Sequence, residues 1–442
     1  MHNLAIALNR KGDKVTGSDD EIFEPSKGRL LKEGILPESN GWKEDNIHED
    51  IDAVILGMHA RKDNPELLKA QMLGLKIYSY PEFLYEQSKN KIRLVIGGSH
   101  GKTSITSMLL HAFKSLELNV DYMVGAQLDG YDCMVKITED APIMVLEGDE
   151  YLSSPIDRRP KFHLYQPTHA LISGIAWDHI NVFPTFENYV EQFEQFCHCI
   201  RNNGQLIYAA NDQTVCDVVN KFELKLNLVP YDVPQYDILD RGTLLHWEGE
   251  TYGLRIFGQH NLQNLIGAMR LAEAVGIKNK DFLLAMTDFF GANKRLEEVV
   301  QVDDFVMYKD FAHSPSKLKA TTNAVKEQFP SRKVVACLEL HTFSSLNQEF
   351  LPQFNGAMDK ADIAYVYYND DVVAHKKLPE LKEEVVQNSF GPKVKIIKNS
   401  DRLKELLMAE KWHNCALLMM SSGNFDGIDF QELGNDLLER IN

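Results

Sequence analysis

The stretch RLVIGGSHGKTSITSMLLHAF, residues 93–113, contains an apolar run, a glycine turn and a helical pattern in that order. Residues 94–96 predict a buried strand, and the apolar residues at 105, 108, 109, 112 and 113 have the spacing of an amphipathic helix. This order directs backbone N–H groups and the positive end of the helix dipole to one point. The stretch therefore predicts an anion-binding turn within an α/β fold.

The turn Gly98–Thr103 carries the side chains that a phosphate cradle uses. Lys102 would reach terminal phosphates, and the Thr103 hydroxyl would bind Mg²⁺. The long form of the motif, G-x-x-x-x-G-K-[ST], is not met, because Ile96 stands where its first glycine belongs. The alternative is an ordinary glycine-rich turn between a strand and a helix.

Length and composition indicate a multidomain globular protein that binds no nucleic acid. A chain of 442 residues suggests about three domains. The formal net charge of −17 argues against non-specific binding to phosphate backbones. The six cysteines form no paired C-x-x-C motif or disulfide framework, which favours a reducing, cytoplasmic setting. No apolar run reaches the ~20 residues of a membrane span, so no membrane association is expected.

Strands and helices alternate in three blocks, residues 1–90, 91–296 and 297–442, with SKNK at 88–91 as the first hinge. This alternation predicts three domains, each a largely parallel sheet with flanking helices. Strands are expected in the following segments: 14–17, 53–57, 76–78, 143–146, 170–173, 205–208, 334–338, 363–366 and 416–420.

Polar side chains directly follow two of these expected strands. Glu147 comes after the strand at 143–146, and Asp178 and His179 come after the strand at 170–173. Ligands in open α/β sheets lie beyond the carboxyl ends of strands, so Glu147, His179 and Thr103 are expected to converge. Mg²⁺ prefers oxygen ligands, which suits Glu147; His179 is either a ligand or a packed, hydrogen-bonded histidine.

Further candidates lie in the helix at 257–277 and at the boundary of the last block. Asn261 and Asn264 are three residues apart, on one helix face, and their amides offer both the donor and the acceptor that an adenine edge requires. Arg295, Asp310 and His313 flank the boundary, where basic groups can clamp phosphates. The alternatives are a plain helix cap and solvated surface residues.

Together these motifs, in this order, resemble the Mur ligase family, the ATP-dependent amide ligases of peptidoglycan assembly. In that family the phosphate loop has the shorter form G-[TS]-x-G-K-[TS], which residues 98–103 match. The resemblance implies a central P-loop ATPase-like domain between Rossmann-like first and last domains. The first, at 1–90, would bind the UDP-sugar; the second, at 91–296, would bind ATP; and the third, at 297–442, would bind the amine and close on the nucleotide.

The resemblance also implies roles for individual residues. The ATP site would comprise Gly98, Ser99, His100, Gly101, Lys102, Thr103, Ser104, Asn261, Asn264, Arg295, Asp310 and His313. Catalytic roles fall to Lys102, Glu147, His179 and Arg295, and the Mg²⁺ ligands would be Thr103, Glu147 and His179. Ser18 and Asp19 would meet the uracil edge of the UDP-sugar.

The resemblance implies that a carboxylate of UDP-N-acetylmuramate attacks ATP and that an amine then attacks the resulting acyl phosphate. Two branches of the family use this acceptor. Segments EGDEY (147–151), DFAHSP (310–315) and MMSSGNFDGI (419–428) resemble the branch that adds the peptide L-alanyl-γ-D-glutamyl-meso-diaminopimelate. Segment LELHTFSSL (338–346) is nearer the branch that adds L-alanine. An inactive nucleotide-binding regulator and a folate polyglutamating ligase are further alternatives, although intact motifs and the segment VTGSD (15–19) argue against them.

Two details concern the binding sites. Some family members carry a carbamylated lysine after the metal-binding histidine, but this chain has no lysine between 161 and 221. Glu194 falls near that position and is either a substitute anion or a solvated helix residue. In the segment 421–427, the hydroxyl groups of Ser421 and Ser422 and neighbouring backbone N–H groups are expected to bind the peptide carboxylates; the alternative is a turn without a ligand.

The N-terminal residues MHNLAIALNRKG match the first helix of the family. The expectation is therefore that the first strand and glycine-rich loop of the UDP-sugar domain are missing from this sequence, through a start codon assigned too far downstream, and that UDP-sugar binding is weak. That loop and helix terminus would hold the diphosphate.

Overall fold

The computed structural model describes residues 1–441, which form two compact units. The first unit comprises Met1–Ile175, Val190–Tyr231 and Gly267–Phe282, and the second comprises Ala176–Tyr189, Asp232–Ile266 and Leu283–Asn442. Helices α6 (Phe186–His198) and α8 (Gln259–Ala274) each pass from one unit into the other. Within residues 1–441, every helix is too short or too polar to cross a bilayer.

The N-terminal part of the first unit contains four helices and a small sheet. Its elements are α1 (His2–Lys11), α2 (Ser26–Lys32), β1 (Val54–Leu56), α3 (Pro65–Met72), β2 (Ile77–Ser79) and α4 (Tyr80–Ser88), with a 3₁₀ turn at Glu44–Asn46. Strands β1 and β2 pair in parallel. The prediction of a strand at residues 14–17 is wrong. The segment forms no strand, because no described strand lies beside it to complete a ladder.

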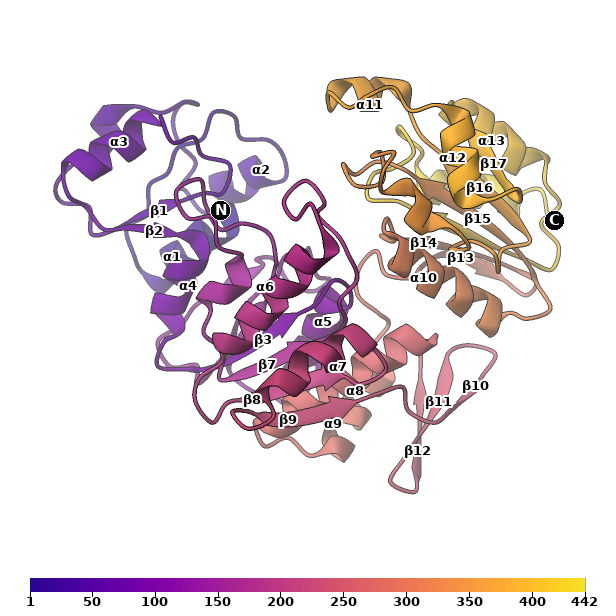
Figure 1. The fold of residues 1–442 in the computed structure, drawn as a ribbon, viewed down its shortest axis with the longest axis horizontal. Coiled ribbons are helices and arrows are strands. Elements are labelled where there is room, and N and C mark those ends of the chain that lie inside the picture. Colours follow the sequence, from indigo (N-terminus) through magenta and orange to yellow (C-terminus); the bar gives the residue numbers. More distant parts are fainter. Residues whose placement is uncertain (442) are drawn as a thin grey trace. The chain divides into compact units, whose positions relative to one another are not determined.

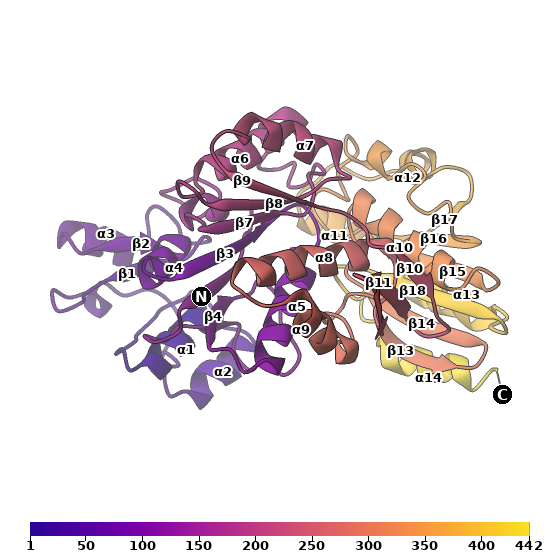
Figure 2. The same ribbon diagram turned by 90° about the horizontal axis from the view of Figure 1, so that it is seen from below.

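The larger sheet of the first unit has seven strands in the order β5-β4-β6-β3-β7-β8-β9. They are β3 (Ile92–Gly97), β4 (Val120–Met123), β5 (Val135–Lys136), β6 (Ile143–Glu147), β7 (His169–Ile172), β8 (Gln205–Ala209) and β9 (Asn227–Tyr231). All pairs are parallel except β4 with β5. Its helices include α5 (Lys102–Ser115) and α7 (Gln213–Val219), and α9 (Asn279–Ala285) begins in this unit and ends in the second (Figures 1 and 2).

Central strands of this sheet are apolar on both sides, as strands covered by helices on both faces must be. Leu94, Val95 and Ile96 of β3 are fully buried. Helix α5 buries ten of its fourteen residues and packs on β3 and β6. The order of strand, turn and helix predicted for residues 93–113 is therefore confirmed.

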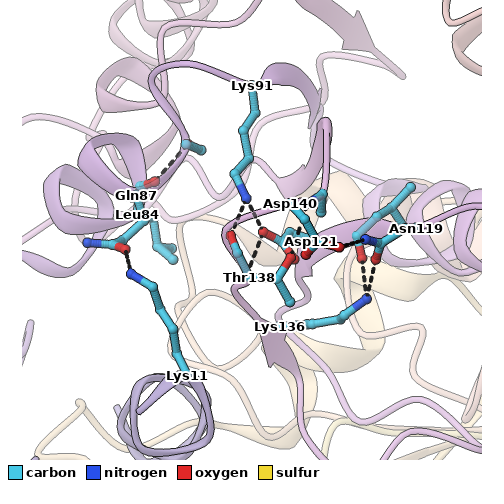
Figure 3. A network of polar contacts seen from close by, with 12 residues as sticks. Lys11, Leu84, Gln87, Lys91, Asn119, Asp121, Lys136, Thr138 and Asp140 are labelled. Carbon is cyan, nitrogen blue, oxygen red and sulfur yellow. Dashed lines mark hydrogen bonds and ion pairs between the residues drawn. The ribbon is translucent and has the colours of Figure 1, made fainter. Parts of the chain in front are cut away.

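The segment around the expected hinge at 88–91 is flanked by polar contacts (Figure 3). Lys91, just before β3, donates to Asp121 Oδ2 and to the Thr138 carbonyl, each at 2.5 Å. Lys11 on α1 donates to Gln87 Oε1 on α4 at 2.9 Å. Residues 88–91, the expected hinge, thus lie inside one compact unit, and the domain boundaries at 90 and 296 stay a prediction.

The second unit contains a six-stranded sheet in the order β13-β14-β18-β15-β16-β17. Its strands are β13 (Glu297–Val302), β14 (Phe305–Asp310), β15 (Lys333–Glu339), β16 (Ile363–Tyr367), β17 (Val394–Ile397) and β18 (Cys415–Met420). Only the β13–β14 pair is antiparallel. A separate antiparallel sheet, which the sequence did not predict, consists of β10 (Tyr236–Ile238), β11 (Thr243–Trp247) and β12 (Glu250–Leu254).

Helices cover both faces of the six-stranded sheet (Figure 1). They are α10 (Pro315–Gln328), α11 (Asp370–His375), α12 (Glu383–Phe390), α13 (Ser400–Ala409) and α14 (Phe430–Leu438). Side chains of α10 and α12 contribute to the core on one face, and those of α13 and α14 to the core on the other. The α/β class with largely parallel sheets and flanking helices is confirmed.

Candidate active site

The turn between β3 and α5 needs glycine at two positions. Gly98 has φ 132°, and a Cβ there would lie 2.1 Å from Ser173 Oγ. Gly101 caps the helix with φ 79°. Both φ values lie in the region that side chains disfavour, so the glycines of the motif are a steric requirement.

The turn is attached to the carboxyl end of the neighbouring strand β7. The Ser99 backbone N–H donates to the Gly174 carbonyl at 3.0 Å. The Ser173 hydroxyl donates to the His100 carbonyl. Sequence reasoning did not select Ser173 or Gly174, because only the sheet order places β7 beside β3. These contacts fix the turn at the carboxyl edge, where ligands of open α/β sheets bind.

Thr103 and Glu147 meet at this edge, as predicted. The Thr103 hydroxyl donates to Glu147 Oε1 at 2.8 Å, and the Gly125 backbone N–H donates to Oε2 at 3.0 Å. Burial raises the pKa of Glu147, and the two hydrogen bonds only partly counter it. A buried carboxylate beside a hydroxyl is costly by itself, and a hard cation would offset that cost.

Lys102, the first residue of α5, lies over the turn. Its Nζ donates to the Gly98 carbonyl at 2.5 Å and to Glu150 Oε2 at 2.6 Å. Burial would lower the pKa of Lys102, but the carboxylates of Glu150 and Asp149 raise it above its ordinary value. Lys102 is therefore a cation held in place by Glu150, a residue that the sequence analysis missed although it lies in EGDEY.

Together these residues can bind a polyphosphate with its metal. The helix N-terminus and Lys102 are suited to anionic oxygens, while the Thr103 hydroxyl and the Glu147 carboxylate are the hard ligands that Mg²⁺ prefers. Ser104, in the first turn of α5, is also buried next to this turn. The donor set thus fits the predicted cofactor.

His179 lies in the second unit, on the segment Ala176–Tyr189. It has φ 54°, an uncommon conformation for a non-glycine residue. Its backbone N–H donates a hydrogen bond to Asp178 Oδ1 at 2.8 Å, which helps to hold this conformation. Asp178 lies 3.6 Å from Lys317 Nζ. Although burial would raise the pKa of Asp178, Lys317 and His179 lower it. The role of His179 as a metal ligand stays a prediction.

Asp310 and Arg295 flank one turn of the second unit. Asp310 is buried and accepts the N–H groups of Leu296 and Ala312, each at 2.7 Å. Burial raises the pKa of Asp310, with Arg295 acting in the opposite direction. The Arg295 guanidinium lies 4.8 Å from the centre of the Phe311 ring. The structure therefore brings the RLE (295–297) and DFAHSP segments together.

His313 shares an electrostatic environment with Asp178. Its Nδ1 lies 2.7 Å from the Phe311 carbonyl. Burial is the main cause that lowers the pKa of His313 to about 3, and the nearby charge of Lys317 is the second. His313 is therefore neutral near pH 7. Asp178 and His313, from motifs more than a hundred residues apart, are thus close enough to shift each other's pKa.

Asn261 and Asn264 lie on the first turns of α8 and are both largely buried. Asn261 Nδ2 donates to the Phe257 carbonyl at 3.0 Å. Their placement on one helix is confirmed, and their contact with adenine stays a prediction.

Ser18 and Asp19 lie in the N-terminal part of the first unit. The Ser18 hydroxyl donates to Glu66 Oε1 at 2.8 Å and accepts from Asn46 at 3.1 Å. Burial and the neighbouring Asp20 raise the pKa of Asp19. Ser18 is thus engaged with its own loop, and its role toward uracil stays a prediction.

Glu194 on α6 forms an ion pair with Lys221 in the first unit. This partner already balances its charge, which favours the interpretation of Glu194 as a helix residue with a structural ion pair rather than a free anion.

Comparison with known proteins identifies two family models. Residues 1–91 match the catalytic domain of the Mur ligase family, and residues 96–272 match the Mur ligase middle domain. A UDP-N-acetylmuramate–L-alanine ligase of Caldicellulosiruptor saccharolyticus is 31% identical over 83% of this chain and 81% of the relative. The UDP-N-acetylmuramate–L-alanyl-γ-D-glutamyl-meso-2,6-diaminoheptandioate ligase of Haemophilus influenzae is 24% identical over 97% of this chain and 95% of the relative.

Solved structures share the fold. A murein peptide ligase of Psychrobacter arcticus superposes with a TM-score of 0.64 at 22% identity, covering 99% of this chain and 96% of that one. A UDP-N-acetylmuramate–alanine ligase of Thermotoga maritima superposes with a TM-score of 0.69 at 20% identity, covering 100% and 96%. Both amine specificities thus occur among the structural relatives.

Proposed function

The chain belongs to the Mur ligase family of ATP-dependent amide ligases in peptidoglycan synthesis, and we propose that it joins UDP-N-acetylmuramate to L-alanyl-γ-D-glutamyl-meso-diaminopimelate. The observation that carries the ligase chemistry is the convergence of Lys102, Thr103 and Glu147 at one strand edge. The peptide substrate is supported by EGDEY, DFAHSP and MMSSGNFDGI and by the relative from Haemophilus influenzae over 97% of the chain.

The first step would transfer the γ-phosphoryl group of ATP to the carboxylate of the UDP-sugar. A carboxylate oxygen attacks the γ-phosphorus, the bond to the bridging oxygen breaks, and ADP leaves with that electron pair. Lys102 and the N–H groups of the turn would stabilise the charge that spreads over the moving group. Thr103 and Glu147, with His179 as a further proposed ligand, would hold Mg²⁺, which would supply charge neutralisation.

In the second step the amine would attack the carbonyl carbon of the acyl phosphate. The tetrahedral adduct expels inorganic phosphate, the nitrogen loses a proton, and an amide remains. No side-chain nucleophile is needed. Asn261, Asn264, Asp310 and His313 would hold the nucleotide, Arg295 its phosphates, and Ser18 and Asp19 the uracil.

L-Alanine is the second candidate amine. It is supported by the relative at 31% identity, which carries that substrate in its name, and by the segment LELHTFSSL. The two candidates share the acceptor and the phosphoryl chemistry, so only the amine distinguishes them.

A substrate panel tests both. Phosphate release is measured with ATP, Mg²⁺ and UDP-N-acetylmuramate, adding L-alanine, the tripeptide or no amine. We expect release that depends on the UDP-sugar and is faster with tripeptide than with L-alanine at equal concentration. Faster release with L-alanine would select the second candidate, and release that ignores every amine would contradict a ligase and favour a nucleotide-binding regulator.

A further inference from the structure

A buried carboxylate lies at the carboxyl end of the six-stranded sheet, far in sequence from the phosphate turn. Glu339 is the last residue of β15 and is 4% exposed. The parallel register pairs Glu339 with Tyr367 of β16 on one side. On the other side it pairs Leu338 with Met420 of β18, so Ser421 follows beside Glu339. Three polar side chains therefore end three adjacent strands on the same face.

Glu339 holds the loop that follows β18. Ser421 donates its hydroxyl to Glu339 Oε2, and the Phe425 backbone N–H donates to the same oxygen at 2.9 Å. Gly423 passes so close that a Cβ there would lie 2.9 Å from that oxygen. A single carboxylate oxygen thus fixes both ends of the segment 421–425.

The loop keeps a conformation that is unfavourable for its residues. Phe425 and Asp426 have φ of 53° and 60°, followed by Gly427 at 97°. Left-handed backbone at non-glycine residues costs free energy and persists where the surroundings enforce it, often at ligand sites. Two contacts hold Phe425 in this conformation. Its N–H donates to Glu339, and its ring lies 5.8 Å from the ring of Tyr367, measured between centroids.

Three of the donors expected to bind peptide carboxylates are used within this loop. The Ser421 hydroxyl serves Glu339, the Gly423 N–H donates to Ser421 Oγ at 2.6 Å, and the Gly427 N–H donates to Asn424 Oδ1 at 3.1 Å. For the Ser421 hydroxyl and the N–H groups of Gly423 and Gly427, the expectation of direct substrate binding is therefore not supported by the geometry. Their contacts shape the loop instead.

Other polar atoms at the same edge await a partner. Among residues 1–441, no hydrogen bond is made by three buried atoms, Tyr367 Oη, Ser422 Oγ and His341 Nδ1. Tyr367 is 1% exposed, whereas His341 Nδ1 lies 3.6 Å from Glu339 Oε1 and forms an ion pair with it when the histidine is protonated. Buried polar atoms are nearly always paired in native proteins, so unpaired ones clustered at a strand edge indicate a ligand.

We propose that Glu339 is a positioning residue for the incoming amine: its buried carboxylate holds the Ser421–Gly427 loop in the shape that receives the amine substrate. The inference rests on the proposed ligase function. Glu339 itself need not touch the substrate. Tyr367 Oη and Ser422 Oγ, which make no hydrogen bond among residues 1–441, are the groups available to the polar atoms of a zwitterionic amino acid or peptide.

The test separates binding of the amine from binding of the other substrates. Glu339→Gln and Ser421→Ala each weaken the anchor, whereas Ser421→Thr keeps the hydroxyl. With the better amine of the panel above, we expect both weakened variants to raise the KM for that amine about tenfold, a typical cost for a lost hydrogen bond to a charged group. The KM values for ATP and UDP-N-acetylmuramate should stay within about twofold.

A matched control lies at the opposite end of the same strand. Glu410 pairs with Lys333, the first residue of β15, at 2.7 Å, and Glu410→Gln should leave all three KM values unchanged. The double variant Glu339→Gln/Ser421→Ala should raise the amine KM no further than the stronger single variant, because both changes remove one anchor.

An unchanged amine KM in folded Glu339→Gln and Ser421→Ala, or an equal rise for all three substrates, would overturn the proposal. If Glu339→Gln does not fold, Ser421→Ala against Ser421→Thr decides alone in the same way. A wild-type enzyme that uses neither amine defeats the proposed function itself, whereas an active wild-type enzyme with unaffected variants defeats only the role of Glu339.

Discussion

The phosphate turn after β3 and the Ser421–Gly427 loop after β18 use the same local device. In both, a hydroxyl that follows a strand donates to a buried carboxylate at the end of an adjacent strand: Thr103 to Glu147, and Ser421 to Glu339. The two carboxylates are nevertheless shifted in opposite directions. Burial raises the pKa of Glu147, while at Glu339 the contributions of His341, Ser421 and Phe425 exceed that of burial and lower the pKa.

The difference teaches what each loop is built to bind. The phosphate turn holds the cation Lys102, and its Glu147 carboxylate is buried with only partial compensation, so under the proposed function a polyphosphate with its metal would complete the site. The second loop satisfies its carboxylate internally and stays closed on itself. Under the proposed function, the ligand would complete the first loop, whereas the second loop already has its shape without a ligand.

Loss of the Lys102 cation should have the largest effect. Lys102→Ala is expected to lower kcat about 10²–10³-fold, because one preorganised charge aimed at the transferred phosphoryl group is removed. Turnover is measured at saturating substrates, with thermal unfolding to verify folding, since Glu150 loses its partner. Lys114→Ala, on the exposed side of the same helix, is the control. Near-normal turnover in Lys102→Ala would remove the turn from the mechanism.

A smaller effect is expected when one proposed metal ligand of the phosphate turn is removed. Thr103→Val keeps the shape but removes the hydroxyl, and should raise the Mg²⁺ concentration for half-maximal activity about 10–100-fold. Thr106→Val is the matched control, because Thr106 is buried on α5 and its hydroxyl has no partner among residues 1–441. Equal Mg²⁺ requirements in the two variants would contradict metal binding by Thr103.

The glycines of the two loops should differ in how well they tolerate substitution by alanine. Gly98→Ala places a Cβ 2.1 Å from Ser173 Oγ, so the turn must move and both thermal stability and ATP affinity should fall. At Gly427 a Cβ meets nothing within 4 Å, and only its φ of 97° is unfavourable. Gly427→Ala should cost about 1–2 kcal/mol. Unfolding midpoints and ATP titration measure both, and equal losses would show that steric closeness does not separate the loops.

The smallest effects concern the two carboxylates, in opposite directions. Without Mg²⁺ near pH 7.5, Glu339→Gln should lower the unfolding midpoint, whereas Glu147→Gln should raise it or leave it unchanged. The folded pKa of Glu339 lies below its ordinary 4.5, so its stabilisation is present above pH 4.5 and is lost as the pH falls through the folded value. The folded pKa of Glu147 lies above 4.5, so its favourable contribution exists below pH 4.5 and is lost as the pH rises through the folded value.

Differential scanning fluorimetry between pH 3.5 and 8 measures these slopes. The deficit of Glu339→Gln relative to the wild type should shrink toward acid pH, whereas the unfolding midpoint of Glu147→Gln should fall relative to the wild type toward acid pH. Parallel curves for the two variants would contradict the opposite pKa shifts.

Most of the fold was predictable because periodicity is a local property. The strands near 143–146, 205–208, 334–338 and 416–420 lie where alternation with helices placed them. The segment 14–17 failed for a tertiary reason, since a strand needs a neighbour and none of the described strands lies beside it. The sheet β10–β12 was missed because its three short strands carry little apolar pattern.

The sequence by itself determined the phosphate turn, since Gly98, Gly101, Lys102 and Thr103 are consecutive or nearly so and act through local geometry. Only the tertiary structure decided what each carboxylate does. Glu150 holds Lys102 from 48 residues away, and Glu339 holds Ser421 from 82 residues away. Such pairs depend on strand order and register, which bring distant residues to one sheet edge and which no local pattern encodes.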